Sequence, residues 1–252
     1  PHPHPHPPPH PHPHSNQARW PFPPHTLRVL PCDAAAVPPA EASTLGARAR
    51  RPLSGSELGL LSGGVAAWRL ALREGWEWCL VLAGGAPPRH AATAPQLLAA
   101  LPPLARAAAH HDAHWALLVL SPYTPLSPVD SAAVFAACPP EAAPAMCGLG
   151  PGAPRSLLAS PQPLGESGGA GGAGGAPGWQ RVGPTRDALG WVYSAALMRD
   201  LLSAWEAHEP PLSPLGVWVW EVMAARGHLL HALAPVEPLV SARPCPTPMA
   251  PA

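Results

Sequence analysis

The sequence predicts an α/β fold, and three features carry this prediction. Short apolar segments such as Trp76–Leu82 and Trp115–Leu120 have the length and continuous hydrophobicity of strands buried on both faces. Segments with apolar residues at steps of three and four alternate with them, as amphipathic helices do. Glycine and proline separate the two kinds of segment. This alternation indicates βα units that form a mostly parallel sheet with flanking helices.

Length and composition limit the kind of protein. The chain has 252 residues, which is enough for one domain with tails. Charged residues make up 12% and the formal net charge is +0, which argues against nucleic acid as a partner. No apolar run approaches the roughly 20 residues of a membrane span. The chain begins with Pro1 and shows no signal peptide, so we expect it to be part of a longer protein.

The five cysteines form no CxxC pair and their number is odd, which disfavours a disulfide framework or a structural zinc site. Cys79 lies inside an apolar run, and we expect it to be a small buried side chain.

Low-complexity segments bound and interrupt the expected domain. In residues 1–25 histidine alternates with proline, which favours extended, disordered chain over a packed core; loose metal capture is the alternative. The expected folded domain covers residues 26–243. Within it, residues 139–178 are rich in proline and glycine and predict a flexible insertion. Residues 244–252 form a second disordered tail.

The first elements of the domain are a strand and a helix start. Thr26–Pro31 predicts a strand, and residues 34–53 predict an Ala/Pro-rich connection. Its arginines, Arg48, Arg50 and Arg51, favour a solvated loop, with steering of a phosphate as the alternative. Ser54 followed three residues later by Glu57 predicts a capping box, so a helix begins there.

That helix has one apolar stripe and two unusual glycines. The stripe consists of Leu58, Leu61, Val65, Trp68 and Leu72. Gly63 and Gly64 lie in mid-helix, where glycine costs about 1 kcal/mol relative to alanine. Such a cost indicates either close backbone packing or the loss of earlier side chains. Gly75 predicts the end of the helix.

The strand Trp76–Leu82 follows and ends in Ala83-Gly84-Gly85. Ligands of open α/β sheets bind at the carboxyl ends of strands, so this loop is the first candidate site.

The remaining expected elements follow in order. They are a helix over Ala94–His110 interrupted by two prolines, a strand over Trp115–Leu120, a short helix near residues 130–138, a strand over Leu189–Tyr193, helices over Ala195–Trp205 and Ser213–Arg226, and a closing strand over His228–Ala234. His110, His111 and His114 cluster between a helix and a strand. Metal binding and an exposed helix end both remain open for this cluster.

Residues 53–85 resemble glycosyltransferase family 25. The family's central stretch reads like LT-x-GEIGC-x-x-SH-x-x-x-W, followed by W-x-LVLEDD. This chain has LSGSELGLLSGGVAAW and then WCLVLAGG. Trp115–Leu120, Leu189–Leu202 and the segment PLSPLGVWVWE resemble later family segments, so the resemblance covers roughly residues 26–243.

The resemblance implies a GT-A-like, Rossmann-type fold. It also implies transfer of a hexose from a UDP-sugar to a hydroxyl of a glycan or protein acceptor, with Mn²⁺ or Mg²⁺ as cofactor in an active member. The compartment stays open, although family members of the collagen-modifying type point to the lumen of the endoplasmic reticulum or Golgi.

The departures from the family pattern fall on chemical positions. The family's Glu-Asp-Asp falls on Ala83-Gly84-Gly85, and its Ser-His falls on Gly63-Gly64. The Asp of its P-[IV]-D motif falls near Gly216. Alanine and glycine have no ligand atoms, so we expect no intact catalytic or metal site and impaired transfer. The alternative is a catalytically inactive binding or scaffold relative of the family.

Two residues remain as candidate substrate contacts. Glu57 matches a family glutamate, but it also suits a helix cap. Tyr193 lies where a nucleotide contact is possible, but it equally suits a core aromatic.

Overall fold

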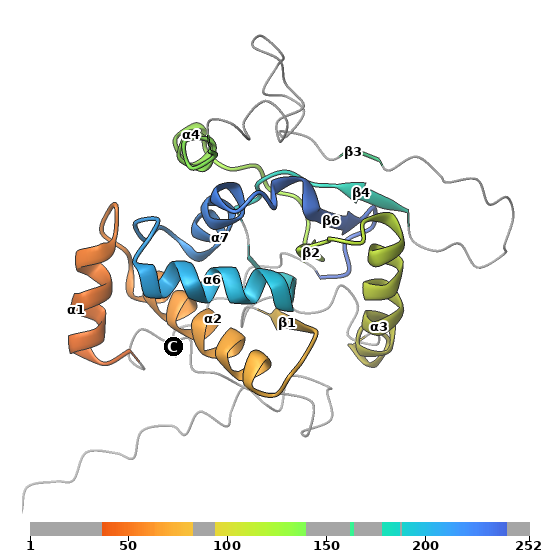
Figure 1. The fold of residues 1–252 in the computed structure, drawn as a ribbon, viewed down its shortest axis with the longest axis horizontal. Coiled ribbons are helices and arrows are strands. Elements are labelled where there is room, and N and C mark those ends of the chain that lie inside the picture. Colours follow the sequence, from red (N-terminus) through yellow and green to blue (C-terminus); the bar gives the residue numbers. More distant parts are fainter. Residues whose placement is uncertain (1–36, 83–93, 140–161, 164–177, 187, 241–252) are drawn as a thin grey trace, which may run out of the picture.

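The computed structural model describes residues 37–82, 94–139, 162–163, 178–186 and 188–240 (Figure 1). The helices are α1 (Pro39–Arg48), α2 (Gly55–Arg73), α3 (Ala94–His111), α4 (Pro128–Ala136), α6 (Ala195–Ala207) and α7 (Leu215–Ala225), with a 3₁₀ turn η5 (Leu229–His231). The strands are β1 (Trp78–Leu82), β2 (Leu117–Val119), β3 (Gln162–Pro163), β4 (Trp179–Arg181), β5 (Gly190–Ser194) and β6 (Ala232–Pro235). The described chain therefore has the mixed α/β character that the sequence predicts.

The described strands form one six-stranded sheet in the order β1-β5-β2-β6-β4-β3. The pair β2 and β6 is parallel, and the other four neighbouring pairs are antiparallel. The expectation of a mostly parallel sheet is therefore wrong. Continuous apolar runs report burial on both faces, but they do not encode strand direction.

Strand direction nevertheless defines one common edge. Because β5 is antiparallel to both β1 and β2, the strands β1, β2 and β6 all run in the same direction. Their carboxyl ends consequently meet at one edge of the sheet, called the carboxyl edge below. Their starts define the opposite, amino edge.

Helices cover both faces of the sheet (Figure 1). On one face α2, α6 and α7 pack on Leu117 and Val119 of β2 and on Trp191 and Tyr193 of β5. On the other face α3 packs on side chains of the same strands that point the opposite way, including Leu118. The alternation along each strand thus builds two apolar layers from one short sheet.

The helix α2 has the expected start and end. The Ser54 hydroxyl accepts a hydrogen bond from the Glu57 N–H, and the Glu57 carboxylate accepts one from the Ser54 N–H, which completes the capping box. Gly75 adopts a φ of 73°, the left-handed conformation that ends helices and that glycine reaches without strain. Trp68, in the middle of the apolar stripe, is fully buried.

Several segments differ from expectation. The expected closing strand over His228–Ala234 begins as the 3₁₀ turn η5 and is a strand only in β6. The region 34–53 contains α1, because Pro39 fits the first turn of a helix and the following alanine-rich sequence favours helix. The region 139–178 contains β3, which pairs with β4. Trp76 precedes β1 and is 44% exposed instead of continuing the strand. The expected strand Thr26–Pro31 lies outside the described residues.

The helix α3 runs through Pro102 and Pro103 without a break. Of the helices that the structure describes, none combines the length and hydrophobicity required to cross a bilayer.

Candidate functional site

Helix starts gather at the carboxyl edge. The helix α2 leads through Gly75 directly into the start of β1, so α2 itself begins at the carboxyl edge. For the same reason α7, which leads into β6, begins there, and α4 follows the end of β2. Amide groups and polar cap residues therefore converge on the edge where α/β enzymes bind ligands.

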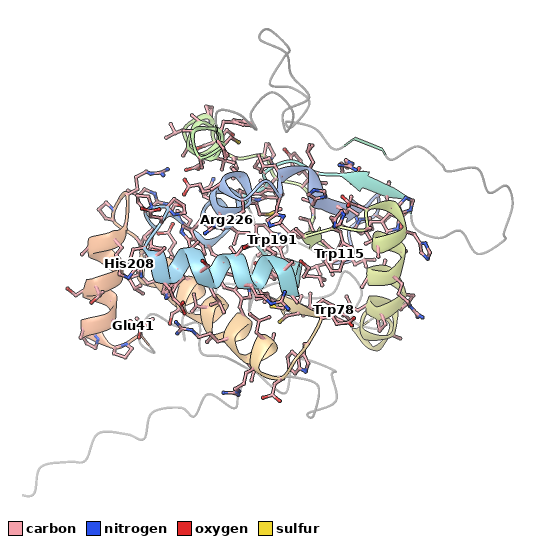
Figure 2. All side chains as sticks on the ribbon, viewed as in Figure 1. Glu41, Trp78, Trp115, Trp191, His208 and Arg226 are labelled. Atoms are coloured by element: carbon pink, nitrogen blue, oxygen red, sulfur yellow. The ribbon has the colours of Figure 1, made fainter. Side chains whose placement is uncertain are left out.

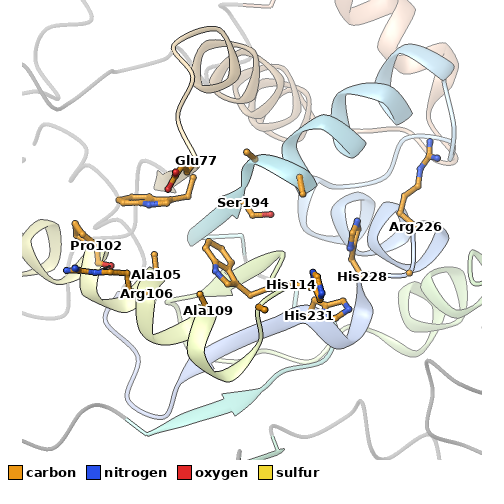
Figure 3. Close-up of a pocket in the computed structure, with 16 residues that line it drawn as sticks. Glu77, Pro102, Ala105, Arg106, Ala109, His114, Ser194, Arg226, His228 and His231 are labelled. Carbon is orange, nitrogen blue, oxygen red and sulfur yellow. Dashed lines mark hydrogen bonds between the residues drawn. The ribbon is translucent and has the colours of Figure 1, made fainter.

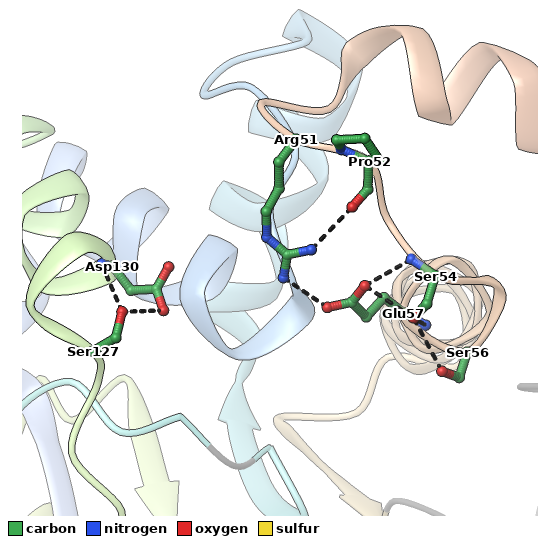
Figure 4. A network of polar contacts seen from close by, with 7 residues as sticks. All are labelled: Arg51, Pro52, Ser54, Ser56, Glu57, Ser127 and Asp130. Atoms are coloured by element: carbon green, nitrogen blue, oxygen red, sulfur yellow. Dashed lines mark hydrogen bonds and ion pairs between the residues drawn. The ribbon is translucent and has the colours of Figure 1, made fainter.

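Glu57 is fully engaged in contacts at the start of α2 (Figure 4). Its Oε1 accepts a hydrogen bond from Arg51 at 2.8 Å, and its Oε2 accepts bonds from the Ser54 N–H at 2.7 Å and hydroxyl at 2.9 Å. Partial burial raises the pKa of Glu57, but the bonds from Arg51 and Ser54 outweigh it and lower the pKa below its ordinary value. The carboxylate is ionised and held as a cap.

Asp130 has the same kind of role at the start of α4 (Figure 4). Its Oδ2 accepts a bond from the Ser127 hydroxyl at 2.8 Å, and that hydroxyl accepts one from the Asp130 N–H at 3.1 Å. This second polar cap satisfies the first turn of α4.

Glu221 is the most deeply buried acid of the described chain, with a side chain that is 0% exposed. Its Oε1 accepts a bond from Arg50 at 2.7 Å, and its Oε2 accepts one from Ser213 at 3.2 Å. Burial raises the pKa of Glu221 above its ordinary value, although Arg50 and Ser213 oppose this shift.

Gly216 has no room for a side chain. A Cβ added to this residue would collide with the carbonyl oxygen of Arg186. The close approach of two backbones therefore leaves no space for an aspartate side chain at this position.

Gly63 and Gly64 lie in the buried middle of α2. A Cβ at Gly64 would lie 3.4 Å from Leu215 Cδ1 and 3.5 Å from the ring of Trp68, an ordinary packing distance. A methyl group fits there, but the space beyond it belongs to Leu215 and Trp68. Gly64 thus lies where α2 packs closely against Leu215 at the start of α7.

Tyr193 is a core residue of β5 and is 1% exposed. Its ring meets Trp68 edge-on, with centroids 5.4 Å apart. Burial raises the pKa of its phenol. A ligand would have to displace core side chains to contact it.

Ala83-Gly84-Gly85 lie outside the described residues. At the end of β1, Leu82 pairs with Gly190 of β5. A Cβ at Gly190 would lie 2.9 Å from Val240 Cγ2 and 3.4 Å from Leu82 Cδ2. Close apolar packing therefore reaches the carboxyl end of β1.

The described acids of this edge do not fit a divalent cation. Glu57, Asp130 and Glu221 each bind hydrogen-bond donors of the protein, and Glu57 and Glu221 also bind an arginine. Within residues 37–240, as far as they are described, no group of three or more His, Cys, Asp or Glu is arranged to hold a metal ion. These hydrogen bonds hold the first turns of α2 and α4 and the middle of α7.

Sequence reasoning expected solvated arginines before α2 and did not anticipate the contact of Arg50 with Glu221. One feature of the sequence does indicate that Glu221 needs a partner. Glu221 is the lone acid in the otherwise apolar helix LGVWVWEVMAA, and a buried acid requires a partner.

No family model, curated protein or solved structure matches the chain.

Proposed function

We propose that this chain is a glycosyltransferase family 25-like domain that keeps a GT-A-type scaffold while transfer of a hexose from a UDP-sugar is impaired. Its function is then that of a catalytically inactive binding or scaffold relative of the family. The resemblance of residues 53–85 supports the ancestry, and the packing of the motif positions favours the inactive form.

The sheet supports the scaffold part of this proposal. A nucleotide-sugar fold needs several strand ends at one edge, and β1, β2 and β6 provide them. In the sequence, the family's Glu-Asp-Asp position comes directly after β1.

The contact between Gly216 and Arg186 is the main support for the proposal that the domain is inactive. An aspartate at position 216 requires the two backbones to separate, because even a Cβ collides with the Arg186 carbonyl. The site has therefore closed around the glycine, and substitution back to the family residue does not by itself rebuild the site.

The negative charge that develops on UDP also favours the inactive form. Departure of UDP leaves negative charge that a bound divalent ion neutralises, typically worth several kcal/mol of barrier. Alanine and glycine at positions 83–85 offer no ligand atoms, and Glu57, Asp130 and Glu221 are already bound to protein donors.

Calorimetry of the full chain with UDP-glucose and UDP-galactose, each with and without Mn²⁺, tests this proposal. We expect no binding that depends on Mn²⁺. Titration of Mn²⁺ alone is the control. Metal-dependent binding at micromolar strength would overturn the inactive form.

A restoration series separates lost ligands from closed packing. Ala83→Glu, Gly84→Asp and Gly85→Asp are introduced together, and UDP-sugar hydrolysis is measured by release of UDP. We expect no gain, because Gly216 and Gly64 remain packed. Hydrolysis by the triple variant would show that the rest of the site is intact.

A further inference from the structure

A cavity lies at the amino edge, opposite to the carboxyl edge that holds the candidate site. Figure 3 shows the residues that line it. Its volume is about 780 Å³, and it is open to solvent. Residues at the start of β1 and β2, the end of β5 and the turn after α7 line it, together with α3. Pro102 and Arg106 lie at one end, Arg226 and His228 lie at the other, and Ser194 lies between them (Figure 3). We call this cavity the amino-edge groove.

The groove carries two arginines without acidic partners. In the described part of the chain, neither Arg106 nor Arg226 has a carboxylate within ion-pair distance. Arg106 makes a long bond of 3.4 Å to the Pro102 carbonyl, and both side chains belong to exposed residues. Glu77, which is also exposed, is the acid that lines the groove. Both ends of the groove thus offer free guanidinium groups to an anion.

Three histidines form one wall, and two of them are oriented by acids behind them. His231 Nδ1 lies 2.8 Å from Asp112 Oδ2, and His228 Nε2 lies 2.7 Å from Asp200 Oδ2. A carboxylate accepts hydrogen bonds, so these ring nitrogens donate, and the second nitrogen of each ring remains for a ligand. The His114 and His231 rings are 6.1 Å apart.

Asp112 is itself held in place as a charged group. It accepts bonds from His231 and from the His114 N–H, and Arg181 lies 3.9 Å away. Burial raises the pKa of Asp112, but these neighbours outweigh it and lower the pKa overall. The orientation of the histidine wall therefore has a structural support outside the groove.

Two indole rings add flat apolar surface between the basic ends. Trp78 and Trp115 both line the groove and are both partly exposed. The surface around them is made of small side chains, namely Ala105, Ala109, Ala113, Ala195 and Ala196. Rings of a ligand therefore have access to the indoles, whose electron-rich faces attract the positively polarised C–H groups of a sugar ring.

The start of α6 opens on the same groove. Ser194 caps this helix, and its first turn contains no acidic residue. The positive end of the helix dipole adds to the charge of the arginines.

We propose that the amino-edge groove binds an anionic oligosaccharide, that is, a short chain of sugar rings carrying sulfate, phosphate or carboxylate groups. Arg106 and Arg226 bind charged groups toward the two ends, the histidine wall binds a further anionic or hydroxyl group, and the indoles contact ring faces. An inorganic anion alone would leave the indoles without a partner, and a neutral glycan would leave the arginines without one. This site is independent of the proposed function, because it shares no residue with the carboxyl edge.

Calorimetry with the full chain and a heparin-derived tetrasaccharide tests the proposal, in the absence of UDP-sugar and Mn²⁺. We expect Arg106→Gln and Arg226→Gln each to weaken binding about tenfold, as loss of one charge-assisted contact does. Arg69→Gln on α2 is the matched control, since Arg69 is an exposed arginine that does not line the groove. We expect the control to bind as the unmodified chain does.

The role of the indoles is tested with Trp115→Leu and Trp78→Leu, whose folding is checked by circular dichroism. Quenching of tryptophan fluorescence by the tetrasaccharide in the unmodified chain gives a readout that needs no variant. A quenching midpoint that moves to an about tenfold higher concentration in Arg226→Gln supports the site.

Three results would overturn the proposal. A neutral tetrasaccharide that binds equally well excludes anion recognition. Binding of the sulfated tetrasaccharide that is insensitive to both arginine variants places it elsewhere. A single-stranded oligonucleotide that binds tighter than the tetrasaccharide would assign the groove to nucleic acid instead.

Discussion

Arg50 and Glu221 form an ion pair of 2.7 Å between one side chain that is 44% exposed and one that is 0% exposed. The arginine reaches water and the glutamate does not, so only the arginine regains solvation when the pair is broken. The pair joins the loop before α2 to α7 and thereby ties two helix starts of the carboxyl edge together.

The two halves of this pair have unequal effects on stability. Arg50→Met leaves the Glu221 carboxylate buried without its partner, and we expect a loss of about 3 kcal/mol in the free energy of unfolding. Glu221→Gln leaves Arg50 free to reach water, and we expect a loss of about 1 kcal/mol. Urea denaturation at neutral pH measures both. Equal losses would show that the exposure of the remaining partner does not determine the loss in the free energy of unfolding.

The pair also has a pH signature. The pKa of Glu221 is raised in the folded state, so its contribution to stability is fully present below the unfolded pKa and is lost as pH rises through the folded pKa. We expect the loss caused by Arg50→Met to shrink as the pH falls through the folded pKa of Glu221, which lies above the unfolded pKa, because the protonated side chain no longer needs the guanidinium. Denaturation curves of both proteins between pH 4 and pH 8 measure this loss, because the range begins near the ordinary pKa of a carboxyl group. A loss that is constant with pH would contradict this origin.

Gly216→Ala tests the closed packing at the start of α7. The added Cβ collides with the Arg186 carbonyl, and we expect a loss of about 3 kcal/mol in the free energy of unfolding. Gly46→Ala in α1 is the matched control, because nothing lies within 4 Å of its added Cβ. We expect the control to gain about 0.5 kcal/mol from helix propensity. A neutral Gly216→Ala would mean that the two backbones separate easily and would remove the main support for the inactive form.

The contribution of the α2 capping box to stability can also be measured. Ser54→Ala removes the hydroxyl that accepts the Glu57 N–H, and we expect a loss of about 1 kcal/mol. The pKa of Glu57 is lowered, so its contribution is present above the unfolded pKa and is lost as pH falls through the folded pKa. Ser62→Ala is the control, since Ser62 lies in the same helix beyond its first turn and its hydroxyl donates to Glu41. A loss in Ser62→Ala of the same size would argue against capping as the cause.

Cysteine reactivity reports the burial of β1. Burial raises the pKa of Cys79 to about 11, so the thiolate that reacts with iodoacetamide is scarce at neutral pH. Cys138, at the end of α4, is less buried. We expect alkylation of Cys138 to precede that of Cys79, measured by peptide mass spectrometry. Prior alkylation of Cys79 would indicate that β1 opens readily.

Sequence reasoning predicted those parts of the fold that local chemistry determines. The capping box at Ser54, the left-handed Gly75 and the apolar stripe through Trp68 each depend on neighbouring residues, and each is confirmed. The direction of β5 depends on which strands it pairs with far along the chain, and no local pattern encodes it.

The same limit applies to the sites. The sequence marks Gly216 as a substituted motif position, but the Arg186 carbonyl that fills the space comes from a segment some thirty positions earlier. The groove histidines are likewise separated in the chain. His114 was visible only in a local cluster with His110 and His111, whereas the structure joins it to His231.

The two edges of the sheet differ in how they tolerate change over time. The carboxyl edge depends on Arg50, Glu57 and Glu221, and the amino-edge groove depends on Arg106, Arg226 and the histidine wall, with no side chain in common. Substitutions that erase one set therefore leave the other untouched. Each edge can therefore be altered by substitution while the other serves as an internal reference in the same fold.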